Sequence, residues 1–264
     1  ALQDVHDPAI IQTHGQYYLY STGGGIQWRS SQNRADWAYG GDVLGGVPPW
    51  AEDITEGDLW APDIAYFNDR YHLYYSASTF GSGRSAIGVA TTPVLSSDSA
   101  AYEWTDQGKV IESYEADPYN AIDPNVIMDE EGRLWMAFGS WNDTGIRMRR
   151  LNPETGKPSS EDETFYSLAN RPDVDENAIE APYIIRRNDF YYLFVSFDHC
   201  CEGEDSDYNI RVGRSESVTG PYEDKDGTPM TEGGGTLVLD GWDQWKGPGH
   251  NAVLQDDGET FLVY

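Results

Sequence analysis

"AIDPNVIMDEEGRLWMAFGS", residues Ala121–Ser140, decides the fold class. It places an acid beside a proline, then an apolar run, an acidic turn ending at Gly132, and a second apolar run rich in aromatic residues. Two short apolar runs around such a turn are typical of a β-hairpin, because Gly, Asn and Asp tolerate the positive φ angles of tight turns. The stretch therefore predicts two antiparallel strands with a carboxylate, Asp123, beside the start of the first.

The same phrase occurs five times along the chain. Its other copies are "DPAIIQTHGQYYLYST" from Asp7, "APDIAYFNDRYHLYYSAS" from Ala61, "EAPYIIRRNDFYYLFVSF" from Glu180 and "HNAVLQDDGETFLVY" from His250. The equivalent marker positions are Pro8, Pro62, Pro124, Pro182 and Asn251. They lie about 60 residues apart, which is too long for one hairpin and suits four strands plus a loop.

This spacing predicts the architecture. Third-strand segments follow three of the copies: "IGVATTP", "IRMRRLNPETGKP" and "IRVGRSESVTGPYEDKDG". A repeated four-stranded sheet without helical periodicity is typical of a β-propeller. We therefore predict an all-β, five-bladed β-propeller in which residues 1–264 form a single catalytic domain. The fifth copy ends after two strands, so the fifth blade is expected to be incomplete.

Polar residues at the start of each copy predict one shared site. In a propeller the first strands line the central axis and run parallel, so their starting ends meet at one mouth. Those residues are Asp7, Asp63, Asp123, Glu180 and His250, each within two residues of a marker. Converging carboxylates repel one another, and at least one should have a raised pKa. Because such conflicts occur mainly at functional sites, we place the active site at this mouth. The alternative is that each acid merely caps a turn.

Charge and composition restrict the partners. The chain has 45 acidic and 17 basic residues, a formal net charge of −28, and 13% aromatic residues. Nucleic acid and anionic membranes are therefore excluded as partners by repulsion, and no run of 18 apolar residues spans a membrane. The excess of acids is explained by a solvated surface or by adaptation to salty or acidic surroundings. A secreted form that has lost its signal peptide is expected, with an intracellular form as the alternative.

The two cysteines, Cys200 and Cys201, are adjacent. They form either a vicinal disulfide or two buried thiols, and the sequence leaves both readings open.

Paired carboxylates around a neutral polar ligand indicate glycoside hydrolysis. One protonated acid donates to the leaving oxygen, one carboxylate activates water or attacks directly, and a third tunes the acid. Aromatic residues supply surfaces on which sugar rings pack.

Five motifs carry a resemblance to a known family. They are "HDPAII" (His6–Ile11), "WAPDI" (Trp60–Ile64), "IDPN" (Ile122–Asn125), "IEAPYI" (Ile179–Ile184) and "GPGHN" (Gly247–Asn251). In this order and spacing they resemble glycoside hydrolase family 43. Together with "STFGS", "SFDHCC" and "YNIRVGRS", they are most similar to its arabinanases, which cut α-1,5-linked L-arabinan. The match covers nearly the whole chain.

The resemblance implies roles for individual residues. Asp7 matches the general base, Glu180 the general acid, and Asp123 the residue that tunes and orients the acid. Members of the family invert the anomeric centre, which requires base and acid carboxyls roughly 6.5–9.5 Å apart. Arabinanases also carry an axial metal, usually assigned as Ca²⁺, with a histidine matching His250 among its ligands and water completing the shell. From the residues alone, a lone histidine is more often structural, and Ca²⁺ prefers oxygen ligands.

Five further residues are candidates for substrate contacts. Trp60 and Phe80 resemble positions that pack on arabinose rings, and the polar candidates near the same mouth are Asp63, Asn125 and Ser140. Alternatively, the two aromatic residues pack the blades, and Ser140 is an inner-strand residue satisfied by backbone. We expect a monomer that acts on arabinan or arabino-oligosaccharide as an inverting endo-arabinanase. The alternatives are an exo-arabinanase, an α-L-arabinofuranosidase or a β-xylosidase on the same fold, and a non-catalytic carbohydrate-binding propeller.

Overall fold

The computed structural model describes residues 5–264, and this part of the chain is almost entirely β-structure. Its three helices are single 3-10 turns: η1 (Asp175–Asn177), η2 (Gly203–Asp205) and η3 (Met230–Glu232). The absence of long helices agrees with the predicted all-β class.

The first two sheets each contain four antiparallel strands in sequence order. The first sheet consists of β1 (Ala9–Thr13), β2 (Gln16–Ser21), β3 (Gln27–Ser31) and β4 (Ala38–Asp42). The second consists of β5 (Trp60–Phe67), β6 (Arg70–Ala77), β7 (Ser85–Thr92) and β8 (Thr105–Ser113).

The next two sheets repeat the pattern. The third consists of β9 (Asn125–Met128), β10 (Leu134–Phe138), β11 (Ile146–Asn152), β12 (Lys157–Pro158) and β13 (Tyr166–Ala169), where β12 and β13 both pair with β11. The fourth consists of β14 (Ile179–Arg187), β15 (Phe190–Phe197), β16 (Asn209–Ser215) and β17 (Thr236–Leu239). The fifth copy forms a two-stranded sheet, β18 (Ala252–Asp256) and β19 (Glu259–Val263).

The propeller prediction is confirmed, but the predicted number of blades is wrong. Residues 5–264 form four complete blades rather than five, because the fifth copy supplies only the hairpin β18–β19. The third strands predicted from sequence are present as β7, β11 and β16.

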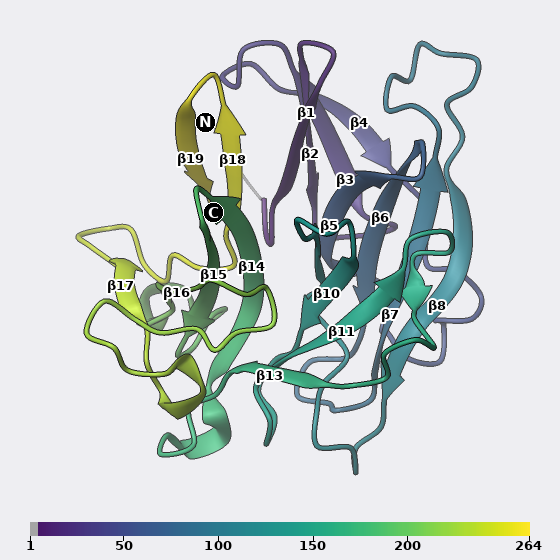
Figure 1. Ribbon diagram of the computed structural model, residues 1–264. Helices are drawn as coiled ribbons and strands as arrows, with labels where there is room; N and C mark the ends of the chain where they lie inside the picture. Colours follow the sequence, from purple (N-terminus) through teal and green to yellow (C-terminus); the bar gives the residue numbers. More distant parts are fainter. Residues whose placement is uncertain (1–4) are drawn as a thin grey trace.

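The first strands of the five copies form a closed ring. β1 contacts β5, β5 contacts β9, β9 contacts β14, β14 contacts β18, and β18 contacts β1. Figure 1 shows the sheets arranged around this centre, with the yellow hairpin lying between purple β1 and green β14. The ring thus brings the starts of five distant segments to one end of the molecule.

The predicted hairpin turns have the backbone that their residues favour. His14, Asn68, Asn188 and Asp257 all have φ between 49° and 55°, and Gly132 has φ 77°. Asn, Asp and Gly adopt this left-handed conformation at low cost, so the turns hold each first and second strand in register.

The hydrophobic core lies between consecutive blades rather than inside one of them. One cluster joins the first two sheets, a second joins the second and third, a third joins the third and fourth, and a fourth joins the hairpin to β1 and β2. Strands β6 and β7 are buried along nearly their whole length, because neighbouring blades cover both faces. Burial on both faces explains why these strands lack apolar–polar alternation.

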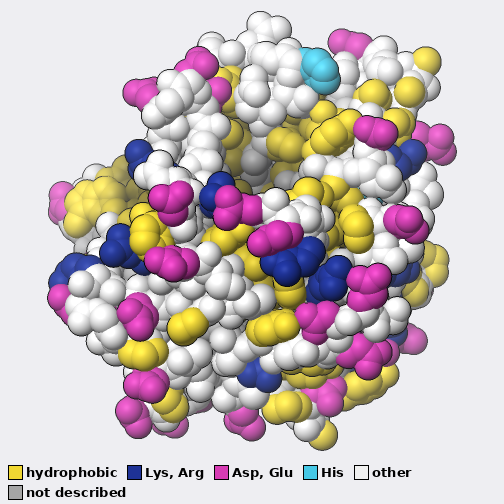
Figure 2. Space-filling model, in the orientation of Figure 1, with side chains coloured by type: hydrophobic (Ala, Val, Ile, Leu, Met, Phe, Trp, Pro, Cys, Tyr) yellow, Lys and Arg dark blue, Asp and Glu magenta, His cyan; other side chains and the backbone are white. Residues whose placement is uncertain are grey.

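The surface carries the negative charge. In Figure 2 the acidic side chains are scattered over the visible face instead of forming one patch. None of the helices within residues 5–264 has the length and apolar character needed to cross a membrane.

His72 on β6 provides the first testable prediction, on stability. It is 3% exposed and stacks on Phe67, with ring centroids 3.6 Å apart. Burial lowers the pKa of His72 to about 4, against the opposing effect of its hydrogen bond to the Arg70 carbonyl. An unfolded histidine has a pKa of about 6.5. Between about pH 6.5 and pH 4 His72 binds a proton in the unfolded chain but not in the folded one. The contribution of His72 to the free energy of unfolding therefore falls as the pH is lowered.

His72→Phe keeps an aromatic ring and removes this ionisation. The difference in unfolding free energy between wild type and variant should therefore change by about 3 kcal/mol between pH 7 and pH 4, with the wild type losing more. Urea denaturation at several pH values measures this difference. His14→Gln, which alters an exposed histidine at the β1–β2 turn, serves as the control. A difference that stays constant over the pH range contradicts the prediction.

Candidate active site

The residue before each marker has an uncommon backbone conformation. Its φ angle is positive in all five copies, although none of these residues is glycine: Asp7 (53°), Ala61 (45°), Asp123 (57°), Ala181 (55°) and His250 (43°). The pairing register of β5 and β14 shifts at the same place. Non-glycine residues rarely adopt this conformation, and it clusters at functional sites. Here it turns the strand starts so that Asp7, Asp123 and His250 occupy equivalent positions around the ring.

Hydroxyl groups from the preceding blade hold three of these five left-handed residues. The Thr22 hydroxyl accepts the Ala61 N–H at 2.8 Å, Ser76 accepts the Asp123 N–H at 3.0 Å, and Ser196 accepts the His250 N–H at 2.9 Å. These hydroxyls occupy the same register position in their blades. The residue after each marker pairs with a residue of the second strand, and the hydroxyl lies two residues beyond that partner. They satisfy backbone donors that the strand ladder leaves free.

The third blade departs from this pattern. Its equivalent position is Gly139, which has no hydroxyl. The Ala181 N–H instead donates to Oδ2 of Asp123 at 3.1 Å, and the neighbouring Ser140 hydroxyl donates to Oε2 of Glu180 at 2.7 Å. The Asp123 carboxylate therefore takes the place of the structural hydroxyl at the one junction where the predicted acid lies.

Asp7 is held in its ionised form. Its Oδ2 accepts a hydrogen bond from the Thr22 hydroxyl, and its Oδ1 lies 3.1 Å from Nδ1 of His250. Burial raises the pKa of Asp7, but the charge and hydrogen bond of His250 and the hydroxyl of Thr22 outweigh it and bring the pKa to about 2. An ionised carboxylate that is one-quarter exposed is able to accept a proton from water.

Glu180 is held at both oxygens. Tyr208 donates its hydroxyl to Oε1 at 2.7 Å, while Ser140 binds Oε2. Burial and the nearby charge of Glu180 raise the pKa of Tyr208 well above its usual value, so the phenol remains a donor. These two hydrogen bonds fix the direction in which the Glu180 carboxyl points.

Asp123 is buried at 6% exposure beside these groups. Burial is the largest cause that raises the pKa of Asp123 well above its usual range, and the charges of Glu180 and Asp7 raise it further. The charge of His250 and the hydrogen bond from the Ala181 N–H lower this pKa. One carboxyl at the mouth thus has a raised pKa, as expected, but burial rather than repulsion among the carboxylates is the largest cause. Asp123 is thus buried and bound to the backbone next to Glu180, and its role in tuning that residue stays a prediction.

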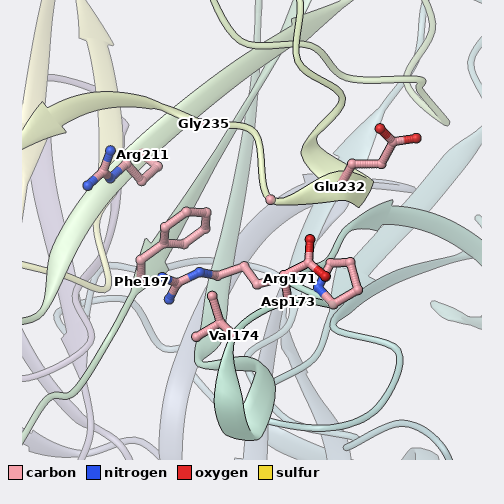
Figure 3. Close-up of a pocket in the computed structure, with 9 residues that line it drawn as sticks. Arg171, Asp173, Val174, Phe197, Arg211, Glu232 and Gly235 are labelled. Carbon is pink, nitrogen blue, oxygen red and sulfur yellow. The ribbon is translucent and has the colours of Figure 1, made fainter.

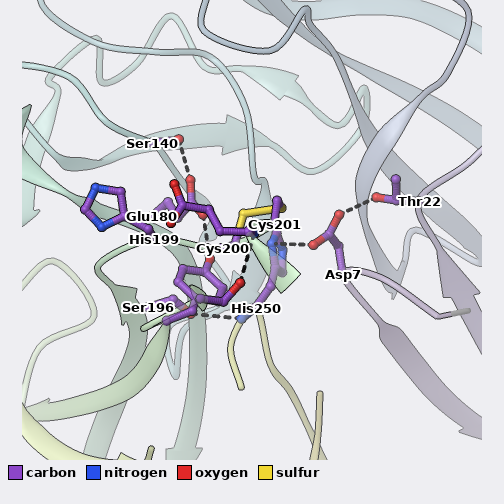
Figure 4. The surroundings of a disulfide bond; sticks show 12 residues. Asp7, Thr22, Ser140, Glu180, Ser196, His199, Cys200, Cys201 and His250 are labelled. Carbon is purple, nitrogen blue, oxygen red and sulfur yellow. Dashed lines mark hydrogen bonds and ion pairs between the residues drawn. A yellow bond between two sulfur atoms is a disulfide. The ribbon is translucent and has the colours of Figure 1, made fainter. Parts of the chain in front are cut away.

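His250 completes the cluster. Burial lowers its pKa, but the charges of Asp7 and Asp123 dominate and raise it to about 9. Figure 4 shows Asp7 and Glu180 on either side of His250. The structure thus brings Asp7, Asp123, Glu180 and His250 together at the mouth.

The residues at the mouth fit only a metal ion with a water-rich shell. Within residues 5–264 no group of three or more His, Cys, Asp or Glu side chains is arranged to hold a metal. His250 offers one imidazole, and the adjacent buried carboxamide of Asn251 has no hydrogen-bond partner in the described part of the chain. One imidazole and one amide oxygen leave most ligands of a hard cation to water.

Asp63 and Asn125 are buried links between inner strands. Asn125 donates to Oδ1 of Asp63 at 3.3 Å and accepts the Ile184 N–H at 2.8 Å, while Oδ2 of Asp63 accepts the Val126 N–H at 2.7 Å. Burial raises the pKa of Asp63 to about 6, against these hydrogen bonds. Both side chains join β5, β9 and β14, and their contact with a substrate stays a prediction.

The two aromatic candidates differ in exposure. Trp60 is half-buried at the start of β5, whereas Phe80 is 81% exposed in the β6–β7 loop. Such an exposed ring is open to a ligand, and its role also stays a prediction.

One loop contributes residues that sequence reasoning did not assign. The loop Asp198–Tyr208 contains Tyr208 and His199. The ring of His199 meets the ring of Trp141 edge-on, with the centroids 4.9 Å apart. Cys200 and Cys201 form a disulfide in this loop, which resolves the alternative left open by the sequence (Figure 4). Tyr208 explains the glycine in "GPGHN", because a Cβ at Gly249 would lie 1.8 Å from its ring, but this contact is visible only in the structure.

Tyr208→Phe tests the role of this hydroxyl. The variant keeps the ring against Gly249 and removes the donor to Glu180. A hydrogen bond to a charged group contributes about 1.5–3 kcal/mol, so kcat should fall about 10- to 100-fold while KM changes little. The control is Tyr222→Phe, whose buried hydroxyl donates to the Val218 carbonyl at 2.8 Å. An unchanged kcat in Tyr208→Phe would show that the hydroxyl does not position the acid.

A separate pocket of about 250 Å³ lies at the edge of the fourth blade. Figure 3 shows the Arg171 guanidinium below the Phe197 ring, 4.1 Å from its centroid. Arg171 also donates to Asp198 at 2.8 Å and to the Ala178 carbonyl at 2.6 Å. These bonds support the loop before Glu180, and none of the predicted site residues lines the pocket.

The arrangement is suited to acid–base chemistry at a glycosidic bond. It combines an ionised carboxylate, a second carboxyl fixed by two hydroxyls, and a buried acid close to both. Carboxyl groups in contrasting environments are the requirement for paired acid and base roles.

Comparison with known proteins identifies similar chains. The model of a family described as Glycosyl hydrolases family 43 matches residues 2–264. The extracellular endo-alpha-(1->5)-L-arabinanase 1 of Bacillus subtilis is 43% identical, over 95% of this chain and 77% of its own length. The extracellular exo-alpha-(1->5)-L-arabinofuranosidase ArbA of Cellvibrio japonicus is 42% identical, over 98% of this chain and 78% of its own. The solved structure of a Cellvibrio cellulosa alpha-L-arabinanase complexed with arabinohexaose has a TM-score of 0.93 and 41% identity, covering 99% of this chain and 86% of that one.

Proposed function

The chain belongs to glycosyl hydrolases family 43, and from this premise we propose that it cuts internal α-1,5-linked L-arabinofuranosyl bonds of arabinan with inversion. The family makes it a glycoside hydrolase, which sets aside the non-catalytic carbohydrate-binding propeller. Arabinan as the substrate is supported by the names of the relatives and by the arabinohexaose bound to one of them.

The observation that carries the proposal is the contrast between Asp7 and Glu180. Asp7 is ionised and paired with His250, so we assign it as the general base that takes a proton from the attacking water. Glu180 is directed by Ser140 and Tyr208, so we assign it as the general acid that protonates the leaving oxygen. Asp123 orients this acid through the Ala181 backbone.

Inversion follows from the assignment of Asp7 as a base that acts on water, and the two carboxyls come from repeats that are not neighbours in the ring. Asp7 belongs to the first copy and Glu180 to the fourth, and the fifth copy with His250 lies between them. An inverting enzyme holds its two carboxyl groups about 6.5–9.5 Å apart to admit a water, whereas a retaining enzyme holds them about 5–5.5 Å apart. The water attacks the face opposite the leaving oxygen as Glu180 gives its proton and Asp7 receives one.

The endo mode is the finer part of the proposal. One relative is named an endo-arabinanase and another an exo-arabinofuranosidase at nearly the same identity, so exo action remains the second candidate. Chromatography of the products formed early from linear arabinan separates them. Mixed oligosaccharides at low conversion support endo cutting, whereas a single small product supports exo cutting.

We also propose one axial Ca²⁺ held by His250 with water as most of its ligands. The cation, if bound there, would supply positive charge at the mouth. Calcium binding requires the neutral imidazole, so it would displace a proton from His250.

Metal analysis after dialysis tests this proposal without relying on activity. The wild type should retain about one calcium per chain and gain about 3 kcal/mol in unfolding free energy at 100 times the dissociation constant. His250→Ala should lose both effects. A wild type that binds no calcium, or a variant that binds it equally, contradicts the assignment.

An extracellular location is supported by the names of two relatives and by the Cys200–Cys201 disulfide. Disulfides persist mainly in oxidising compartments.

A further inference from the structure

The loop between β15 and β16, residues 198–208, carries the Cys200–Cys201 disulfide at the active site. Figure 4 draws the surroundings of this bond, and they include Glu180 and His250. The two cysteines are neighbours in the sequence, so the bond links no distant parts of the chain. It closes a small ring around one peptide bond, and its direct effect is on the backbone of this loop.

Both ends of the loop are bound to the strand that carries Glu180. At the first end, the Asp198 N–H donates to the carbonyl of Ala178, which lies two residues before Glu180, at 3.1 Å. At the second end, the Tyr208 hydroxyl donates to Oε1 of Glu180. The loop therefore begins and ends beside the proposed general acid.

The disulfide ring fixes a backbone angle that the chain does not favour. Cys201 has φ 69°, in the left-handed region that residues other than glycine rarely adopt. The N–Cα bond of Cys201 belongs to the ring, so the disulfide restricts rotation about it. Residues 201–205 are all exposed, so little packing restrains this part of the loop once the ring is open.

A short backbone path joins the ring to Tyr208. His199 precedes Cys200, and its carbonyl accepts the Tyr208 N–H at 3.0 Å. Asp207, the neighbour of Tyr208, accepts the His199 N–H at 2.8 Å. A change in the backbone at Cys200 therefore shifts His199 and, through these two hydrogen bonds, the residue whose hydroxyl directs Glu180.

We propose that the Cys200–Cys201 disulfide is a positioning element for the general acid, and that its reduction lowers kcat by releasing Tyr208 from Glu180. The proposal rests on the proposed function, because it takes Glu180 as the residue that protonates the leaving oxygen. The disulfide touches neither water nor leaving group in this role and acts only through the loop.

A dithiol is the reductant that opens the ring. Its thiolate attacks one sulfur, and its second thiol then displaces that sulfur from the mixed disulfide. Two electrons and two protons pass from the dithiol to the protein, so one S–S bond breaks, two S–H bonds form, and the dithiol becomes a cyclic disulfide. The exposed Cys201 makes the bond accessible to this attack.

Kinetics before and after treatment with dithiothreitol test the proposal. The chain has only two cysteines, so the reductant changes no other bond in the protein. With two thiols titrated per chain, kcat on linear arabinan should fall about tenfold, the lower limit expected for Tyr208→Phe, while KM changes little. On an aryl arabino-oligosaccharide that releases dinitrophenolate, which needs little protonation, kcat should change far less. Reoxidation should restore the original values.

Two variants separate positioning from general loosening of the fold. Cys200→Ser/Cys201→Ser should have the low kcat of the reduced wild type and should not respond to dithiothreitol. In Tyr208→Phe the hydroxyl is already absent, so reduction should cause no further loss.

Three results would overturn the proposal: an unchanged kcat in the reduced wild type, an equal loss on both substrates, or a further tenfold loss when Tyr208→Phe is reduced. Failure of the proposed function is seen separately, as an oxidised wild type that does not cleave linear arabinan.

Discussion

Glu180→Gln is expected to lower kcat on linear arabinan by about 10³-fold or more while leaving oligosaccharide binding intact. General acid catalysis contributes about 10² to 10⁴ in rate, and a carboxamide has no acidic proton to give. The amide keeps the size of the side chain and an oxygen that accepts from Ser140 or Tyr208. Isothermal titration with an arabino-oligosaccharide, beside steady-state kinetics, measures both quantities.

The leaving group provides the control for this variant. An aryl arabino-oligosaccharide that releases dinitrophenolate needs little protonation, so Glu180→Gln should lose far less activity on it than on arabinan. An equal loss on both substrates would mean that Glu180 positions the substrate and donates no proton. Full turnover of arabinan by the variant would remove the assignment altogether.

Asp7→Asn is expected to lower kcat by about 10³-fold on both substrates. Asp7 takes the proton from the attacking water, and this step is needed whatever the leaving group is. The low pKa of Asp7, about 2, means that its carboxylate is available throughout the neutral range. Kinetics with arabinan and with the dinitrophenyl substrate check the prediction.

The two variants together distinguish the roles. Asp106→Asn controls for loss of a carboxylate elsewhere, because Asp106 accepts from the indole of Trp50 and the hydroxyl of Tyr75 away from the mouth. If Asp7→Asn recovered activity on the dinitrophenyl substrate, Asp7 would be the acid rather than the base.

The repeat in the sequence was sufficient to predict the propeller. Turn residues such as Asn68 and Asp257 have strong local preferences, so the hairpins and their register could be predicted from the chain alone. The number of blades could not, because counting copies of a hairpin does not count the outer strands. The short β12 and the hairpin β18–β19 show how much the copies differ beyond their first two strands.

The convergence of acids at one mouth was also predictable, because it follows from parallel inner strands. The conformation that aims them was not predictable. A left-handed Asp123 or Ala181 carries no sequence signature. Each is held by a side chain from another blade, Asp123 by the Ser76 hydroxyl and Ala181 by the Asp123 carboxylate. These long-range contacts exist only after the ring closes. The hydroxyls recur at strand ends, as in Ser76 and Ser196, and this repetition was the available signal.

Assignments of polar residues near the mouth were less secure for a related reason. Asp63 lies one residue after its marker and Glu180 two residues before. Because of this difference, the Asp63 side chain is buried and contacts Asn125, whereas the Glu180 side chain faces Ser140 and Tyr208. Sequence offsets of this size do not reveal the direction of a side chain when the strand contains a bulge.

Proton NMR of the first sugar released from linear arabinan tests the central claim most directly. The account predicts that the newly formed reducing end appears first as the β-anomer, because Asp7 directs a water to the face opposite the α-linkage while Glu180 protonates the leaving oxygen. The α-anomer then grows in by mutarotation. An α-anomer formed first would require a covalent intermediate and two displacements, and would contradict the assignment of Asp7 as a base acting on water.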